Sequence, residues 1–120
     1  MSAVLAERAL HARGAATSTT AIVLLGTGVV GGALLKLLNT DASRSLRLVG
    51  AANSRRQQTD PQRLAQRGLR DQLNQHGAPR DNDSLLAALD ASEAPRKVIV
   101  DATASATLAA RHAEWLAHGY

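Results

Sequence analysis

Three glycines, spaced as in a phosphate-binding turn, are the residues of this chain whose pattern points most directly to chemistry. The run consists of Gly26, Thr27, Gly28, Val29, Val30 and Gly31. It follows an apolar stretch over residues 21–25 and precedes a helix-like stretch that ends near residue 38. In such a turn the first glycine makes the bend, the second lets the backbone approach a phosphate, and the third lets helix and strand pack closely. The pattern predicts a pyrophosphate site at a helix N-terminus, with a glycine-rich turn of another α/β protein as the alternative.

A second group of polar residues follows the apolar run 46–52. Asn53 lies about where a dinucleotide-binding domain places the residue that reads the adenosine ribose, followed by Ser54 and Arg55. An acidic residue at that place would repel a 2′-phosphate, whereas Asn53 does not, and Arg55 or Arg56 could pair with the phosphate. We therefore expect NADP to be the preferred cofactor. One alternative is that the site accepts NAD or both cofactors. Another is that both arginines are solvated and contact no cofactor.

A third polar group follows the apolar run 98–100. Asp101 could act as an acid or base, but an Asp at a strand end more often accepts hydrogen bonds from loop N–H groups. Thr103 and Ser105 could donate hydrogen bonds to a ribose or carboxamide, or cap the helix that follows. The sequence has no metal-ligand spacing among its four histidines, which we expect at the surface. No residue is predicted to be a catalytic base, nucleophile or metal ligand.

These residues are positioned by apolar runs that alternate with helix-like segments. We predict strands at 21–25, 46–52 and 98–102, and a helix at 29–38. Between them the sequence favours a helix that starts at Pro61 and ends at Gly77, and a shorter helix capped by Asp83 or Ser84. A last helix is expected over 106–118. Ala109, His112, Ala113 and Leu116 should share one face of this helix, with Trp115 beside that face, and Gly119 should end the helix.

This order of elements predicts an α/β fold with a Rossmann-type doubly wound parallel sheet. The strand at 98–102 should lie beside the first strand, on the side away from the second. Three strands, and a short fourth near residues 78–81, are fewer than the six such a sheet normally has, so we expect a truncated domain. Residues 1–20 are read as a leader or linker containing a short helix over 4–13, and residues 21–120 as the dinucleotide-binding domain.

Composition narrows the classes of function. The chain has 120 residues, 45% of them hydrophobic, with no cysteine and no run long enough for a membrane span. No secretory signal is evident, so the cytoplasm is the expected compartment. The net charge is +4, mostly from arginine, which could reflect a solvated surface, an anionic cofactor or nucleic acid. No aromatic residue interleaves with the arginines at 55, 56, 63, 67 and 70, so we expect no nucleic-acid partner.

Three phrases together resemble one family. They are residues 23–32, with the glycine-rich run, residues 49–55, which read Val-Gly-Ala-Ala-Asn-Ser-Arg, and residues 98–105, which read Val-Ile-Val-Asp-Ala-Thr-Ala-Ser. They are similar to the N-terminal nucleotide-binding domain of homoserine dehydrogenase, most of all to the form fused behind aspartate kinase. The resemblance extends over about 21–120.

The resemblance implies NAD(P)H-dependent reduction of aspartate semialdehyde to homoserine, a step towards threonine and methionine. It places residues 26–31 at the pyrophosphate, residues 53–55 near the adenosine ribose, and Thr103 towards the nicotinamide. In the family, a later domain holds the substrate, so this piece alone is expected to be inactive, and the full-length protein to be a homo-oligomer. The alternatives are another two-domain NAD(P)-dependent dehydrogenase, or a non-catalytic nucleotide-sensing module.

Overall fold

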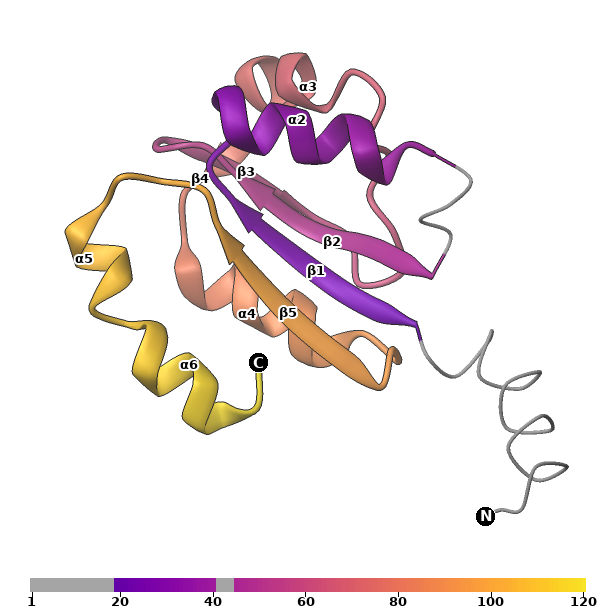
Figure 1. Cartoon of the computed structure of the whole chain (residues 1–120). Coiled ribbons are helices and arrows are strands. Elements are labelled where there is room, and N and C mark those ends of the chain that lie inside the picture. Colours follow the sequence, from indigo (N-terminus) through magenta and orange to yellow (C-terminus); the bar gives the residue numbers. More distant parts are fainter. Residues whose placement is uncertain (1–18, 41–44) are drawn as a thin grey trace, which may run out of the picture.

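The computed structural model describes residues 19–40 and 45–120 (Figure 1). The short helix expected at 4–13, and residues 1–18 of the expected leader, lie outside the described residues. Thr20 already belongs to the first strand, so the ordered sheet begins one residue earlier than the predicted domain boundary.

Five strands form one sheet. They are β1 (Thr20–Leu25), β2 (Leu46–Ala52), β3 (Arg56–Thr59), β4 (Ala78–Pro79) and β5 (Arg96–Asp101). The spatial order is β4-β3-β2-β1-β5. β1 pairs in parallel with β2 on one side and with β5 on the other, as predicted. β3 and β4 are antiparallel additions at the far edge, and β3 was not predicted.

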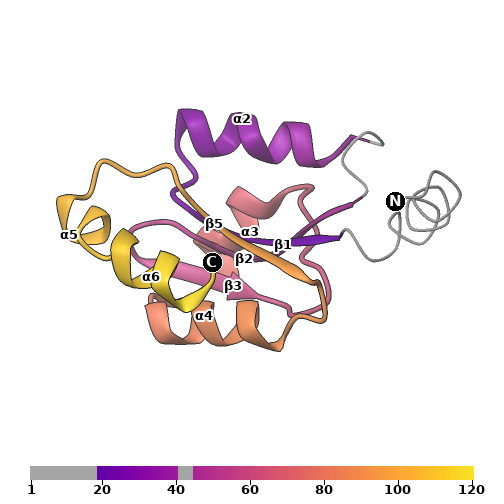
Figure 2. The same cartoon turned by 60° about the horizontal axis from the view of Figure 1, so that its bottom comes forward.

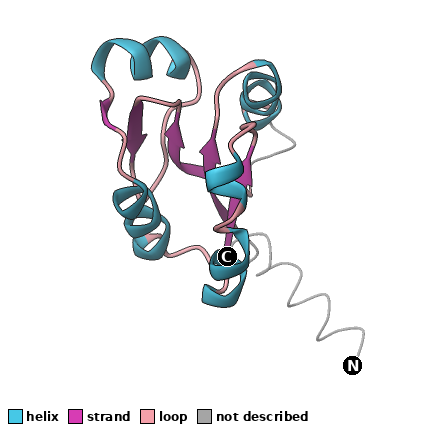
Figure 3. Cartoon of the chain, turned by 90° about the vertical axis from the view of Figure 1, so that its left-hand side faces the viewer, coloured by secondary structure: helices cyan, strands magenta, loops and turns pink. Residues whose placement is uncertain are grey.

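Helices lie on both sides of this sheet. They are α2 (Val29–Leu38), α3 (Leu69–His76), α4 (Asn82–Ala91), α5 (Ala106–Ala109) and α6 (His112–His118). The strands run between the two helix layers, with α2 and α3 on one side and α4 and α6 on the other (Figures 2 and 3). The predicted α/β class, with a doubly wound and mostly parallel sheet, is confirmed.

The alternation of side chains along β1 builds two hydrophobic cores. Ala21, Val23 and Leu25 belong to the core beneath α4 and α6, whereas Ile22 and Leu24 belong to the core beneath α2 and α3. Because successive side chains of a strand point to opposite faces, a strand covered on both faces is apolar at every position. The first core is completed by Leu85, Leu89, Leu108 and Trp115, and the second by Leu35, Leu38, Leu69 and Leu73.

A bulge in β2 shifts the register of its pairing with β1 by one residue. Ile22 is opposite Leu48, but the next residue, Val23, is opposite Gly50, so Val49 is the extra residue. Val49 lies in the core beneath α4, and a Cβ at Gly50 would also point there, 3.1 Å from both Leu85 and Val23. Glycine fits this position because the two successive residues share one crowded face, where a Cβ would press against Leu85 and Val23.

The helix predicted from Pro61 is wrong in its first half. The Asp60 side chain accepts hydrogen bonds from the N–H groups of Gln62 (2.9 Å) and Arg63 (3.4 Å), which makes this segment a turn. α3 starts only after Gly68, whose φ of +69° favours glycine, and it ends before Gly77 as predicted.

The other two helix predictions need smaller corrections. The cap of α4 is Asp81, whose carboxylate accepts from the N–H of Asp83 and the hydroxyl of Ser84, so those two residues are donors to the cap. The helix predicted over 106–118 is two helices, broken at Ala110 and Arg111.

The face that Ala109, His112, Ala113 and Leu116 were predicted to share does not cover the core. All four residues are exposed, whereas Leu108 and Trp115 are buried. The large indole of Trp115 takes the core position because it offers more apolar area than the alanines. Among the described residues, no helix combines the length and the apolar character needed to cross a bilayer.

Candidate functional site

The three loops singled out from the sequence meet at one edge of the sheet. The glycine-rich loop follows β1, Asn53 follows β2, and Ala102 follows β5, and all three strands end at the same edge (Figure 1). The N–H of Gly26 donates to the carbonyl of Ala52 (2.7 Å), and the N–H of Ala102 donates to the carbonyl of Leu25 (2.8 Å). Ligands of open α/β sheets bind outside this edge, where the connections from neighbouring strands diverge.

Two of the three glycines are required by the packing of the protein itself. Gly26 has a φ of +97°, and a Cβ there would lie 2.9 Å from the carbonyl oxygen of Ala102. A Cβ on Gly31 would lie 1.9 Å from the carbonyl oxygen of Gly26. The first and third glycines therefore make the bend and the close packing that the motif predicts.

Gly28 differs, because a Cβ there would meet no atom of the described protein within 4 Å. Its backbone angles are φ −72° and ψ −147°. Packing among the described residues gives no reason for glycine at this position, whereas a ligand approaching the backbone would. This observation fits a phosphate group seated against the loop.

The start of α2 offers the donors that such a group needs. Gly28 is its N-cap residue, no side chain caps the helix, and its first turn carries no acidic residue. Val29 and Val30 are 91% and 69% exposed. Unpaired backbone N–H groups at a helix start favour an anion, so residues 28–31 would hold the pyrophosphate, with Gly26 and Thr27 shaping the turn.

Asn53 is held by its own loop. Its side-chain oxygen accepts from the N–H groups of Arg55 (2.8 Å) and Arg56 (2.7 Å), and its amide nitrogen donates to Asn74 (3.1 Å). The side chain thus shapes the turn into β3, and Ser54 lies exposed within that turn. The role of Asn53 and Ser54 in reading the ribose stays a prediction.

The two neighbouring arginines are not equivalent. The Arg56 guanidinium donates to the carbonyl of Gly77 (2.8 Å) and so helps to attach β3 to the end of α3. Arg55 is exposed, and its side chain has no hydrogen bond or ion pair with another part of the chain that the structure describes. Of the two, Arg55 is the one whose guanidinium is available to an anion.

Arg80 was missed from the sequence. Its guanidinium donates to the carbonyl of Asn53 (2.6 Å) and to the side-chain oxygen of Asn82 (3.0 Å). Burial lowers the pKa of Arg80, and the nearby Asp101 carboxylate opposes that shift. Arg80 thereby connects the end of β2 to the start of α4. This role depends on the pairing of β4 with β3, which no apolar pattern in the sequence indicates.

Asp101 fixes the loop after β5. One carboxylate oxygen accepts from both the N–H (2.9 Å) and the hydroxyl (2.5 Å) of Thr103, and the other lies 2.8 Å from Nε2 of His112. Burial raises the pKa of Asp101, but the hydrogen bonds from Thr103 and His112 outweigh it and leave the pKa below its ordinary value. This is the loop-fixing role considered for Asp101, together with a histidine partner that the sequence did not indicate.

The hydrogen bonds of Thr103 and Ser105 restrict what they can offer a ligand. The Thr103 hydroxyl proton points to Asp101, and its oxygen accepts from the N–H of Ser105 (3.2 Å), so a ligand would meet it only as an acceptor. The Ser105 hydroxyl accepts from the N–H of Leu108 (3.2 Å) and caps α5. The capping role considered for Ser105 is confirmed, and contact of Thr103 with the nicotinamide stays a prediction.

Comparison with known proteins agrees with this geometry. Residues 26–120 match the family model described as the NAD-binding domain of homoserine dehydrogenase. The chain belongs to this family. The NAD-binding domain of this family accounts for the glycine-rich loop at the edge of a parallel sheet.

Individual relatives cover the chain but extend far beyond it. The chloroplastic bifunctional aspartokinase/homoserine dehydrogenase 2 proteins of Arabidopsis thaliana and Zea mays are each 30% identical over 125 residues, covering 97% of this chain. The chain spans only 14% of the length of each. No solved structure matches the chain.

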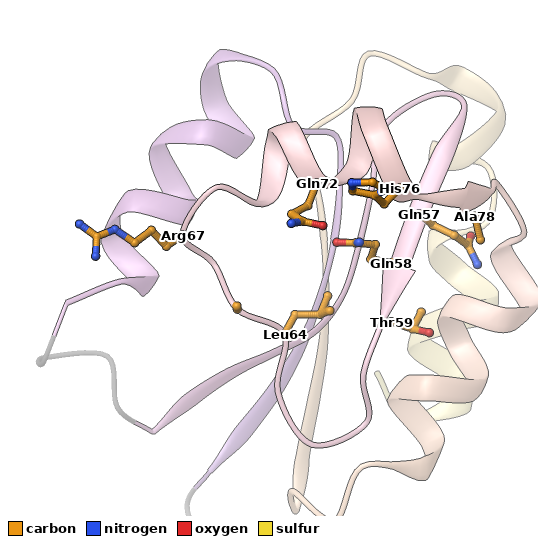
Figure 4. A pocket seen from close by; sticks show the side chains of 9 residues that line it. Gln57, Gln58, Thr59, Leu64, Arg67, Gln72, His76 and Ala78 are labelled. Atoms are coloured by element: carbon orange, nitrogen blue, oxygen red, sulfur yellow. The ribbon is translucent and has the colours of Figure 1, made fainter.

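A polar pocket lies elsewhere in the domain, between β3 and α3 (Figure 4). It has a volume of about 470 Å³ and is lined by Gln57, Gln58, Thr59, Leu64, Ala65, Arg67, Gln72, His76 and Ala78. The side chains of Gln58 and Gln72 extend toward one another in it. None of the predicted site residues lines this pocket, so it is distinct from the edge at the glycine-rich loop.

Proposed function

We propose that this chain is the cofactor-binding part of a homoserine dehydrogenase, which reduces aspartate semialdehyde to homoserine with NADPH or NADH, a step towards threonine and methionine. Membership of the family supports the reaction. The observation in the structure that carries the proposal is Gly28, where the protein leaves the space of a side chain empty beside the uncapped start of α2.

The residues of this chain would bind and orient the cofactor. When bound, the nicotinamide supplies a hydride, so the protein needs no nucleophile of its own. The N–H groups at residues 28–31 would hold the pyrophosphate, and the loop at 101–105 would border the nicotinamide end. The substrate would be held by a further domain, and we expect no turnover by the 120-residue chain alone.

The proposal includes a preference for NADP. Asn53 would place no negative charge beside the ribose, and Arg55, two residues away, offers an exposed guanidinium with no hydrogen bond or ion pair among the described residues. A guanidinium binds a phosphate through charge-assisted hydrogen bonds. Arg56 is the weaker candidate, because one nitrogen of its guanidinium already donates to the carbonyl of Gly77.

Calorimetric titration of the chain with NADP⁺ and, in parallel, NAD⁺ tests both the binding of the cofactor and the preference for NADP. We expect tighter binding of NADP⁺, and Arg55→Ala should weaken NADP⁺ binding about tenfold while leaving NAD⁺ binding unchanged. Arg96→Ala, at an exposed arginine where β5 begins and so at the opposite end of the strands from the glycine-rich loop, is the matched control and should change neither. Binding of neither cofactor by the folded chain would refute the proposal, and equal binding of both would remove the NADP preference.

The proposal also includes an oligomeric state and a cellular compartment. β5 is an edge strand of the described sheet, paired only with β1 there, and Val98 on it is 39% exposed. An apolar edge strand is prone to pair with another chain, which supports a homo-oligomeric parent protein. The cytoplasm remains the compartment we propose, although the two plant relatives are named as chloroplastic.

A further inference from the structure

The loop after β5 would form a wall of the proposed cofactor site, and it is held by a short series of side chains. Asp101 accepts from Thr103, Thr103 accepts from the N–H of Ser105, and Ser105 accepts from the N–H of Leu108. The loop also touches the glycine-rich turn, because the Ala102 carbonyl fills the space where Gly26 would carry a Cβ. A shift of this loop would therefore move the glycine-rich turn as well.

The Asp101 carboxylate that begins this series is itself nearly enclosed. Its side chain is 10% exposed, and one of its oxygens is occupied by the two donors of Thr103. The second oxygen lies 2.8 Å from Nε2 of His112. An ionised carboxylate only accepts hydrogen bonds, so Nε2 must carry the proton in this pair. A largely buried carboxylate without its second donor would lose much of what holds it in place.

His112 is well placed to supply that donor. It lies at the start of α6, three residues before Trp115, which anchors the helix in the core with 5% of its surface exposed. The imidazole and indole ring centroids are 5.6 Å apart. The ring is thus fixed on one side by the anchored helix, while 47% of its side chain remains exposed to solvent.

We propose that His112 is a positioning residue of the cofactor site, which acts by holding Asp101 and, through it, the loop at 101–105. The inference rests on the proposed function, since the loop matters as a wall of that site. The charged groups that face Asp101 are His112 from α6 and Arg80 from the loop before α4, with the Thr103 donors from its own loop. His112 donates through Nε2 to the carboxylate, which can only accept.

Three variants separate a positioning role from a structural one. His112→Leu removes the donor, and we expect NADP⁺ affinity to fall about fivefold, with faster amide hydrogen exchange at Thr103 and Ser105. His112→Gln can place an amide N–H close to the position of Nε2, so it should restore affinity to within about twofold. His118→Leu is the matched control on the same helix. His118 is 62% exposed and lies 3.6 Å from Asp90, so its loss should change neither measurement.

The pH dependence gives a further readout. Without the His112 donor the pKa of Asp101 should rise, so NADP⁺ affinity in His112→Leu should begin to fall at a higher pH than in the unmodified chain. Unchanged affinity, exchange and pH profile in His112→Leu would overturn the inference. His112→Ala serves the same purpose if the leucine variant does not fold. If the unmodified chain binds no cofactor, the proposed function fails, while the exchange measurement still decides whether His112 orders the loop.

Discussion

At the scale of single residues, the glycines of the glycine-rich loop have two different roles, one in packing of the protein and one proposed in ligand binding. A Cβ on Gly31 would lie 1.9 Å from the carbonyl oxygen of Gly26, whereas a Cβ on Gly28 would meet no described atom within 4 Å. Gly31→Ala should therefore destabilise the domain by roughly 3 kcal/mol, because backbone must move. Gly28→Ala should cost less than about 1 kcal/mol and instead weaken NADP⁺ binding about tenfold.

Urea unfolding and calorimetry of the two variants measure these effects separately. The expected pattern is a stability defect in one variant and a binding defect in the other. A Gly28→Ala variant that binds NADP⁺ as tightly as the unmodified chain would mean that no phosphate approaches this part of the loop. Equal stability of both variants would contradict the packing argument for Gly31.

Asn53 allows the specificity argument to be tested with almost no change of shape. Asn53→Asp keeps the oxygen that accepts from Arg55 and Arg56, and loses only the amide donor to Asn74. The added negative charge should repel a 2′-phosphate and accept a ribose hydroxyl, shifting the ratio of NAD⁺ to NADP⁺ affinity about tenfold towards NAD⁺. Parallel titrations measure that ratio, and an unchanged ratio would place the ribose away from Asn53.

Residue types and spacing were enough to find the glycines, because their roles depend on local backbone geometry. Arg80 and His112 could not be found in this way. Arg80 contacts the carbonyl of Asn53, 27 positions earlier, and His112 contacts Asp101, 11 positions earlier. Both contacts exist only after the sheet has formed and α6 has packed on it, so no short sequence pattern records them.

At the scale of elements, the apolar pattern of the sequence predicted the strands and helices that are stabilised by burying apolar side chains. The strand at 46–52 and the helix at 29–38 were predicted with their observed bounds, and β1 to within one residue. β3 was missed because its sequence, Arg-Gln-Gln-Thr, has no apolar residue. It is stabilised by backbone pairing with β2 and β4, and by Gln57, whose buried side chain accepts from the N–H of Asp81 (2.6 Å).

The position of α6 depends on one side chain. Trp115 is 5% exposed and belongs to the core beneath α4, whereas its neighbour Leu116 is 71% exposed. Trp115→Ala should lower the free energy of unfolding by roughly 3–5 kcal/mol, and Leu116→Ala by less than about 0.5 kcal/mol. Urea unfolding followed by circular dichroism measures both. A larger loss in Leu116→Ala would restore the helix face that the sequence predicted.

At the scale of the whole molecule, two titrating groups attach the C-terminal segment to the rest of the domain. Asp101 joins the end of β5 to α6 through His112, and the Tyr120 hydroxyl donates to Asp90 of α4 (2.5 Å). Hydrogen bonds lower the pKa of Asp101 despite its burial. Burial and the Asp90 carboxylate raise the pKa of Tyr120 to about 12. The two shifts act at opposite ends of the pH scale.

The directions of these two pKa shifts predict the pH ranges in which the folded state loses stability. The folded state favours ionised Asp101, so its contribution is present above the ordinary Asp pKa of about 4 and is lost as pH falls below it. The folded state favours neutral Tyr120, so its contribution is present below the ordinary Tyr pKa of about 10. That contribution is lost as pH rises towards 12. Urea midpoints measured against pH should therefore decline at both ends, with Asp101→Asn flattening the acid side and Tyr120→Phe the alkaline side.

Because Tyr120 is the single tyrosine, its ultraviolet titration reports the second group directly. A midpoint near 10, while circular dichroism still shows the folded state, would contradict the contact with Asp90.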